Sequence, residues 1–459
     1  MKSHLKDMTS GSPEKLIFQF SLPLFIGNLF QQIYSIADTM IVGHLLGEHA
    51  LAAVGATISI YFLLITFLTG ASSGFGMIIA RYFGAKDMEG IKKAVGASIF
   101  LSILLTAFLT FVGLFLTEPI LRILQTPEYI ILDSISYLRI LFGAMAFSIS
   151  FNIISGFLQA LGNSRVPLYI LAVSVICNIF LNLWLVAPQG WGMGVGGAAL
   201  ATVLSQLLAA IIGFIYIVKN VPALHISWKH LMPKLPFLKE IFTLAASIGF
   251  ANSVISIGSV ILQTAINQFG VYTIAAFMAA RKVFGITFMP LMTTAIAVST
   301  FTSQNFGAGK IDRIKLGLFA GLKITALWST LMIILAYTVA DHIIRIMSGS
   351  ENPQVIQQAG QYLRISLPFL YALSVLLLYK GLLQGMGKKK IPILTSIIEL
   401  TGKIVATLWI VPRLGFAGIA LAEPLIWLTC AVMLLIILHG RTDSLFRFSL
   451  TQKSFIENL

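Results

Sequence analysis

Two long stretches of this chain carry no charged side chain. Residues 166–218 contain no Lys, Arg, Asp or Glu, and neither do residues 241–280. A membrane-spanning helix needs roughly 20 apolar residues, so each stretch can hold one or two spans. The runs are continuously apolar and lack the alternation of barrel strands. With 57% hydrophobic and only 10% charged residues, the sequence indicates an all-α membrane protein rather than a soluble domain.

Glycine, proline and charged residues divide the apolar sequence into twelve predicted helices. The Gly-rich stretch at 190–197 splits the longest uncharged run. The first uncharged run, 16–37, is too long for a signal-peptide core and lacks a small-residue cleavage pattern, which indicates a retained span. The predicted helices cover residues 16–44, 50–82, 92–117, 130–160, 166–187, 195–218, 238–267, 274–305, 315–341, 355–385, 391–412 and 416–439.

The second half of the chain repeats the first at an offset of about 225 residues. Tyr-Leu-Arg-Ile occurs at 137–140 and again at 362–365, and Phe-Gly-Ala occurs at 83–85 and again at 306–308. An even number of spans per half makes the two halves parallel repeats, related by an axis along the membrane normal. We therefore expect two six-helix lobes. The predicted parts are a tail at 1–15, an N-lobe at 16–218, a linker at 219–237, a C-lobe at 238–440 and a tail at 441–459.

The basic residues follow the topology of these spans. Alternate connectors hold 21 Lys and Arg on one side of the membrane, against only Arg122, Arg345 and Arg413 on the other. By the positive-inside rule both termini and the linker are cytoplasmic, in a multi-pass protein of the cell membrane. The net charge of +14 is thus a topology signal, and we expect no nucleic-acid partner.

Motifs for resident cofactors or catalysis are missing from the sequence. Cys177 and Cys430 both lie in apolar segments, so neither a disulfide framework nor a Cys-based metal site is expected. No predicted span carries a His-Glu-x-x-His, a paired Asp or a Gly-x-Ser-x-Gly arrangement. We expect no enzyme, no bound cofactor and no permanent metal.

Asp38 is the one acidic residue deep within a predicted span of the N-terminal half. A charged residue at mid-membrane costs about 2.5–3.5 kcal/mol on insertion scales, so it usually faces a cavity or a partner. Burial disfavours the charged carboxylate and a nearby cation favours it. Asp38 could therefore exchange a proton or a transiently bound Na⁺ for a positively charged substrate. The alternative is a structural contact that holds the helix in place.

Several motifs in a fixed order carry a family resemblance. Pro23 precedes Asp38 by fifteen residues, Phe-Gly-Ala follows predicted helices 50–82 and 274–305, and Gly-x-x-Gln-(Ala/Gly)-x-Gly-x-x-x-x-Pro begins at Gly156 and at Gly381. Together with the 6+6 repeat, they make residues 14–440 resemble the multidrug and toxic compound extrusion (MATE) family. The resemblance implies a monomeric exporter of organic cations and amphipathic compounds in the lipid bilayer, driven by H⁺ or Na⁺, with alternating access between two lobes.

The resemblance also implies an N-lobe cation or proton site at Asp38, Asn178, Asn182 and Thr202. Asn178 and Asn182 are four residues apart and so share one helix face, and oxygen ligands suit a hard cation. Some relatives have Asp where this chain has Asn182, which leaves Asp38 as the only anionic member. The alternative for each amide is an interhelical hydrogen bond.

The repeat maps this neutral polar set onto charged residues of the C-lobe. Asn178 maps onto Lys403, and Thr202 onto Glu423, while Glu399 lies four residues before Lys403. We expect an intrahelical pair between Glu399 and Lys403, and a network whose net negative charge holds a cationic substrate or a second proton. The alternative is a self-neutralising ion pair that only stabilises the lobe.

A few further positions are candidates for the transport pathway. Tyr34 lies one turn before Asp38, and Gln263 and Asn267 stand on predicted helix 238–267, where NorM-like relatives carry an acid; all three are expected to line a cavity. Pro23 removes a backbone hydrogen bond and is a candidate hinge.

A second function stays open beside drug export. Arg281 and Lys282 are expected to extend to the outer interface, and a contact with a substrate anion is the alternative. Together with Lys380 they also give some support to a flippase for phosphate-bearing lipid-linked substrates. The lone Asp38 and the twelve spans favour the exporter.

Overall fold

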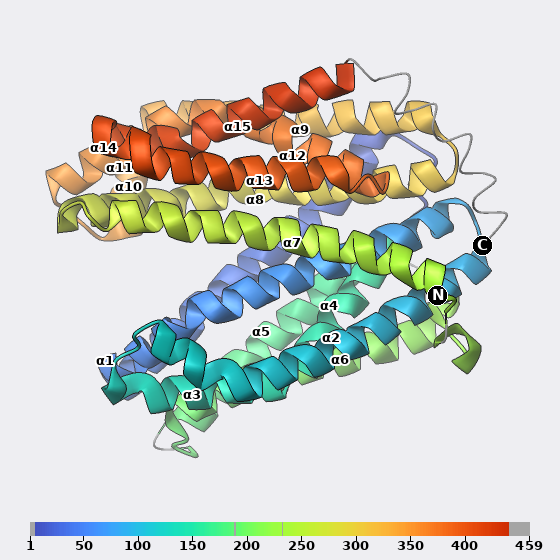
Figure 1. The fold of residues 1–459 in the computed structure, drawn as a ribbon, viewed down its shortest axis with the longest axis horizontal. Helices are drawn as coiled ribbons and strands as arrows, with labels where there is room; N and C mark the ends of the chain where they lie inside the picture. The colour runs from blue at the N-terminus through green and yellow to red at the C-terminus, as the bar shows by residue number, and fades with distance from the viewer. Residues whose placement is uncertain (1–4, 188–189, 232, 440–459) are drawn as a thin grey trace. The chain divides into compact units, whose positions relative to one another are not determined.

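The computed structural model describes residues 5–187, 190–231 and 233–439, and within these ranges all regular structure is helical (Figure 1). Ten of the described helices are long and apolar enough to cross a membrane, and a bent pair of shorter helices makes an eleventh span. The longest helix contains a non-helical break, so it accounts for two of the predicted spans. The predicted all-α membrane fold is confirmed.

The first half of the chain runs from α1 to the linker turns. Its elements are α1 (Pro13–Gly84), α2 (Met88–Ile123), α3 (Glu128–Gly143), α4 (Met145–Ala160), α5 (Arg165–Val186), α6 (Gly194–Asn220) and the 3₁₀ turns η1 (Pro222–Leu224) and η2 (Trp228–Leu231).

The second half has the same order of long helices. Its elements are α7 (Leu235–Ile266), α8 (Val271–Gly307), α9 (Ile311–Thr338), α10 (Ala340–Ser348), α11 (Pro353–Ser366), η3 (Leu367–Phe369), α12 (Leu370–Gly385), α13 (Lys390–Val405), the π-helical turn η4 (Ala406–Ile410), α14 (Val411–Leu414) and α15 (Phe416–His439). The predicted tail at 441–459 lies outside the described residues.

Gly47 divides α1 at the predicted connector between residues 44 and 50. Its backbone has φ 82° and ψ −172°, a combination that is essentially restricted to glycine. Pro23 lies within the helical stretch before this break. The sequence thus places the break correctly, because a residue without a Cβ occurs between two apolar runs.

Three other predicted helices are interrupted in the structure. The helix expected at 130–160 consists of α3 and α4, which are bent by 50°. The helix expected at 355–385 contains the short turn η3 around Pro368. The helix expected at 391–412 widens into η4 just before Pro412, because proline lacks an N–H and its ring crowds the carbonyl four residues earlier.

The described chain forms two compact units. Unit 1 holds residues 5–7 and 23–249, and unit 2 holds residues 8–22 and 250–439. The first part of α1 therefore packs with unit 2, and the first part of α7 packs with unit 1. This division differs from the sequence halves only at the start of the first helix of each half.

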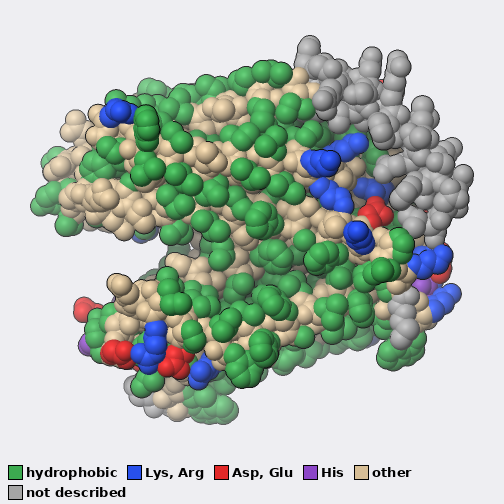
Figure 2. Space-filling view, viewed as in Figure 1, with side chains coloured by type: hydrophobic (Ala, Val, Ile, Leu, Met, Phe, Trp, Pro, Cys, Tyr) green, Lys and Arg blue, Asp and Glu red, His purple; other side chains and the backbone are tan. Residues whose placement is uncertain are grey.

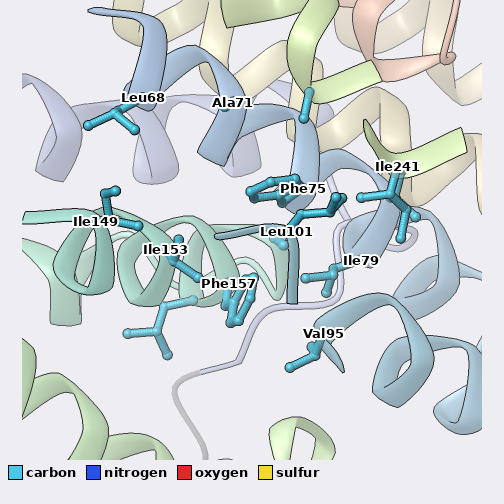
Figure 3. Packing of buried hydrophobic residues seen from close by; sticks show 14 of the residues in the cluster. Leu68, Ala71, Phe75, Ile79, Val95, Leu101, Ile149, Ile153, Phe157 and Ile241 are labelled. Carbon is cyan, nitrogen blue, oxygen red and sulfur yellow. The ribbon is translucent and has the colours of Figure 1, made fainter. Parts of the chain in front are cut away.

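The core of unit 1 takes buried residues from every α-helix from α1 to α7. Phe75 and Ile79 of α1 lie beside Phe157 of α4, and Ile241 of α7 lies in the same buried cluster (Figure 3). Apolar packing of this kind, together with small residues at helix contacts, is what holds helices together in a bilayer.

Each unit contains the same kind of close glycine contact between two of its own helices. A Cβ on Gly156 of α4 would lie 3.1 Å from the carbonyl oxygen of Ser72 in α1. A Cβ on Gly381 of α12 would lie 2.8 Å from the carbonyl oxygen of Ala295 in α8. These are equivalent positions of the sequence repeat, so the repeat reflects equivalent helix packing within each unit.

Apolar side chains dominate the outer surface of the helices. Hydrophobic groups cover much of the face in Figure 2, and the charged groups on it gather near helix ends. Phe108, Phe115 and Phe180 are each more than 60% exposed. Such a surface is suited to contact with lipid tails.

Candidate functional site

Three of the four predicted coupling residues in unit 1 form one hydrogen-bonded cluster. The Nδ2 atom of Asn182 donates to Oδ1 of Asp38 and to Oδ1 of Asn178, both at 3.0 Å. Asn178 and Asn182 are fully buried, while Asp38 is partly exposed. The spacing of four residues places both amides on one face of α5, and that face meets α1 at Asp38.

Thr202 joins the same region through Tyr34. The hydroxyls of Tyr34 and Thr202 are 2.8 Å apart, which links α1 to α6 one turn before Asp38. Thr202 is buried and Tyr34 is half-buried. The sequence predicted Tyr34 as a cavity-lining residue; the structure gives its hydroxyl a partner in the predicted coupling set.

The cluster presents oxygen atoms that suit a small hard cation. Oδ1 of Asn182 is buried and has no hydrogen-bond partner within the described protein, and the Asp38 carboxylate lies next to the same amide. A buried polar atom without a partner costs about 1–3 kcal/mol, which a bound ion or water would offset. Among the described residues, no group of three or more His, Cys, Asp and Glu is placed to hold a metal ion.

Unit 1 contains a second series of hydrogen-bonded polar side chains, which the sequence did not predict. Gln206 lies one turn after Thr202 on α6, accepts a hydrogen bond from the Ser148 hydroxyl and donates to the Tyr61 hydroxyl at 3.5 Å. The spacing of four residues between Thr202 and Gln206 was the available signal. Tyr61 and Ser148 carry no comparable signal, because a hydroxyl alone is common in any helix.

Glu423 in unit 2 lies between two cations. Nη1 of Arg281 in α8 is 2.7 Å from Oε2 of Glu423, and Nζ of Lys403 in α13 is 3.4 Å from Oε1. Arg281 was expected to extend to the outer interface, and this expectation is wrong. The buried carboxylate on α15 holds the guanidinium in the bundle instead.

Glu399 has a different partner from the expected one. Its Oε1 atom is 3.4 Å from Nζ of Lys380 in α12, and Lys380 also donates to Ser396 at 2.7 Å. The predicted intrahelical pair of Glu399 with Lys403 is wrong. Each of the two side chains instead pairs with a charge on a neighbouring helix.

These contacts reverse the predicted sign of the unit 2 network. Arg281, Lys380 and Lys403 supply three positive charges, against the two carboxylates of Glu399 and Glu423. The predicted net negative charge counted only the residues that the repeat maps onto the unit 1 site. The network carries one surplus positive charge.

Two of the remaining candidates, Gln263 and Asn267, are hydrogen-bonded to each other. Gln263 donates to Asn267 at 2.8 Å at the end of α7, and Asn267 is exposed. Their role in lining a cavity stays a prediction, as does the hinge at Pro23.

Known proteins share the sequence pattern of this chain over most of its length. A model of the MatE family matches twice, at residues 23–184 and 247–409, which are the two halves of the repeat. The probable multidrug resistance protein YoeA of Bacillus subtilis is 30% identical over 389 residues, 83% of each chain. The multidrug export protein MepA of Staphylococcus aureus is 24% identical over 432 residues, 94% of each chain.

A solved structure shares the fold. It is described as the outward-facing conformation of a multidrug resistance MATE family transporter of the MOP superfamily, and it matches with a TM-score of 0.87 at 22% identity. The match covers 97% of this chain and 99% of the other. With both halves of the repeat matched by the family model, the chain belongs to the MatE family of multidrug efflux transporters.

Proposed function

We propose that the protein is an antiporter, in which the entry of H⁺ or Na⁺ at Asp38 drives the export of organic cations and amphipathic compounds. The observation that carries the proposal is the hydrogen bond from the buried Asn182 to the Asp38 carboxylate within an otherwise uncharged cluster. Asp38 is the anionic member of this set, so cationic substrate and coupling ion compete for one negative charge.

The chemistry at Asp38 requires only two states of one carboxyl group. As a carboxylate it attracts a positively charged substrate or Na⁺, and as a neutral acid it does not. Asn182 holds the carboxylate oxygen in place, because its amide is itself fixed by Asn178. A proton arriving on a carboxylate oxygen therefore removes the attraction for the cation and favours its release.

Alternating access between two lobes completes the proposal. An outward-facing structure of a protein with this fold supports it. Pro23 is the first residue of α1 that belongs to unit 1, so the chain passes between the two units at a residue that weakens the helix. We propose Pro23 as the hinge of this movement and Gln263, Asn267 and Tyr34 as lining residues.

The proposal extends to topology and assembly. The protein is a multi-pass membrane protein, and the basic connectors support a cytoplasmic position for both termini and the 219–237 linker. The two lobes, 16–218 and 238–440, lie in one chain, so a monomer suffices for transport. No covalent chemistry is required of it.

Ethidium efflux from proteoliposomes tests the proposal. A pH gradient or a Na⁺ gradient is imposed alone, for the wild type, Asp38→Asn and Asp133→Asn. One gradient should drive efflux in the wild type and Asp133→Asn, since Asp133 is an exposed acid of α3, and should fail in Asp38→Asn. Gradient-driven efflux that survives in Asp38→Asn contradicts the coupling role.

A flippase for phosphate-bearing lipid-linked substrates is the second candidate. The surplus positive charge of the unit 2 network favours it. It becomes the better account if neither gradient moves a cationic dye while a phosphate-bearing lipid is translocated.

A further inference from the structure

We propose that Arg281, held by Glu423, binds the carboxylate of amphipathic substrates that carry an acidic group. The assignment rests on the proposed export function and extends its substrate class from cations to zwitterions and anions. The cluster of Arg281, Glu423 and Lys403, called the triad below, supplies the charge.

Lys403 has no donor left for a substrate. An ammonium group has three N–H donors. Those of Lys403 face Glu423 at 3.4 Å, the Ser259 hydroxyl at 2.7 Å and the carbonyl of Ile255 at 3.4 Å. Arg281 and Lys403 together carry two positive charges, and the carboxylate of Glu423 compensates only one of them. Because the donors of Lys403 are all used, Arg281 is the cation that can bind a ligand.

Arg281 is the accessible member of the triad. Its side chain is 35% exposed, against 7% for Glu423 and 5% for Lys403. A guanidinium has five N–H donors, and the bond to Glu423 uses only part of them. Ionisable side chains within a span usually face the bundle interior or a water-filled cavity rather than lipid, so we infer that the exposed part of Arg281 faces such a cavity.

Buried aromatic rings hold the Arg281 guanidinium in a fixed position. Its Cζ atom lies 5.8 Å from the ring centres of Phe277 and Phe284, and Phe284 stacks on Trp427. All three rings are buried. A guanidinium fixed in this way loses little freedom on binding, and its planar fork matches a carboxylate in a bidentate pair.

The face of α8 around Arg281 is apolar and open. Met278 precedes Arg281 at helical spacing, Gly285, Met289 and Met292 follow it, and all four are at least partly exposed. A Cβ on Gly285, one turn after Arg281, would meet no atom within 4 Å. Methionine side chains adapt to different apolar shapes. One fixed cation on an adaptable apolar stripe suits an amphipathic molecule with a single carboxylate.

Two probes with the same body and different head groups test this assignment. Purified full-length protein in phosphatidylcholine nanodiscs is titrated with 1-pyrenebutyrate and with the neutral 1-pyrenebutanol, and binding is followed by fluorescence anisotropy. The wild type should bind the carboxylate roughly 10-fold more tightly than the alcohol, as expected for a charge-assisted hydrogen bond. Equal affinities would overturn the proposal.

Three variants locate the effect. Arg281→Gln leaves Glu423 paired with Lys403, so it should bind the alcohol normally and lose the preference for the carboxylate. Lys282→Gln removes the same charge from an exposed neighbour and should keep the preference. Glu423→Gln removes the competing carboxylate and should strengthen binding of 1-pyrenebutyrate; this variant carries the test if Arg281→Gln fails to fold. A preference that persists in Arg281→Gln, or no gain in Glu423→Gln, would overturn the assignment.

A lipid phosphate could use the same chemistry, and nanodiscs with phosphatidylglycerol separate the two sources. A preference for 1-pyrenebutyrate that survives in these nanodiscs supports a substrate site. Loss of the preference there assigns the triad to a lipid head group and overturns the substrate assignment. Because binding is measured without any gradient, failure of ethidium efflux would overturn the proposed export function alone.

Discussion

The Asn182 side-chain amide donates one hydrogen bond to Oδ1 of Asp38 and a second to the side-chain Oδ1 of Asn178, each at 3.0 Å. Both donors of this amide are therefore committed, and the carboxylate of α1 is held by a side chain that is itself anchored on α5. The arrangement explains how a single acid can be kept in a fixed position within an apolar bundle.

We expect Asn182→Ala to impair coupling more than stability. The variant loses an interhelical hydrogen bond worth about 0.6–2 kcal/mol and releases the Asp38 carboxylate from its fixed position. Ethidium efflux from proteoliposomes should fall roughly 10-fold at a fixed gradient, as for loss of a hydrogen bond to a charged group. Wild-type efflux in a variant with reduced thermal stability would show that Asn182 is only structural.

The pair of Tyr34 and Thr202 should behave as one interaction. Tyr34→Phe and Thr202→Val each remove one hydroxyl of the 2.8 Å contact, at about 0.6–1.7 kcal/mol. The double variant should cost little more than either single variant, because the same hydrogen bond is lost. Thermal unfolding of the four proteins in one detergent gives the comparison, and additive losses would mean that the contact contributes nothing.

Gly47 and Gly270 form a matched pair for a test of backbone strain. They occupy equivalent positions of the repeat, and a Cβ on either would meet no atom within 4 Å. Gly47 has φ 82°, whereas Gly270 has φ −59°. Gly47→Ala should cost about 1–3 kcal/mol through strain alone, while Gly270→Ala should be close to neutral. Equal shifts in the apparent Tm of the two variants would rule out strain at Gly47.

The sequence predicts the spans well because long uncharged runs and glycine or proline breaks are local properties. Gly47 and the Gly-rich turn at 190–197 mark helix ends through their own residues. The break of the 355–385 helix at Pro368 carries a weaker signal, because proline is also tolerated within continuous membrane helices. The span predicted at 315–341 ends at Thr338 of α9, three residues early, and the short helix α10 follows it.

The sequence predicts contacts within the sites only where they depend on the spacing of residues along a single helix. The spacing of Asn178 and Asn182 places them on one face, and the structure brings that face to Asp38. The pairing of Glu399 with Lys380 depends on how α12 and α13 pack, and the repeat gives no information on it because its unit 1 counterparts are neutral. Arg281 was misplaced for the same reason, since its partner Glu423 lies 142 residues later on α15.

The pair of Lys380 and Glu399 should be structural. Both side chains are buried, and Lys380→Met would leave the Glu399 carboxylate without its cation, which costs about 3–5 kcal/mol for a buried pair. Lys380→Met combined with Glu399→Gln should recover most of this loss. Thermal unfolding measures both variants; a double variant as unstable as the single one would contradict the pairing.

Competition between substrate and coupling ion at Asp38 is the central claim, and equilibrium binding of ethidium to the purified protein tests it most directly. Affinity is measured across pH and across Na⁺ concentration for the wild type and Asp38→Asn. We predict that wild-type affinity falls as protons or Na⁺ are added, and that Asp38→Asn binds roughly 10-fold more weakly with no such dependence. An Asp38→Asn variant that keeps the wild-type affinity and the same ion dependence would contradict the account.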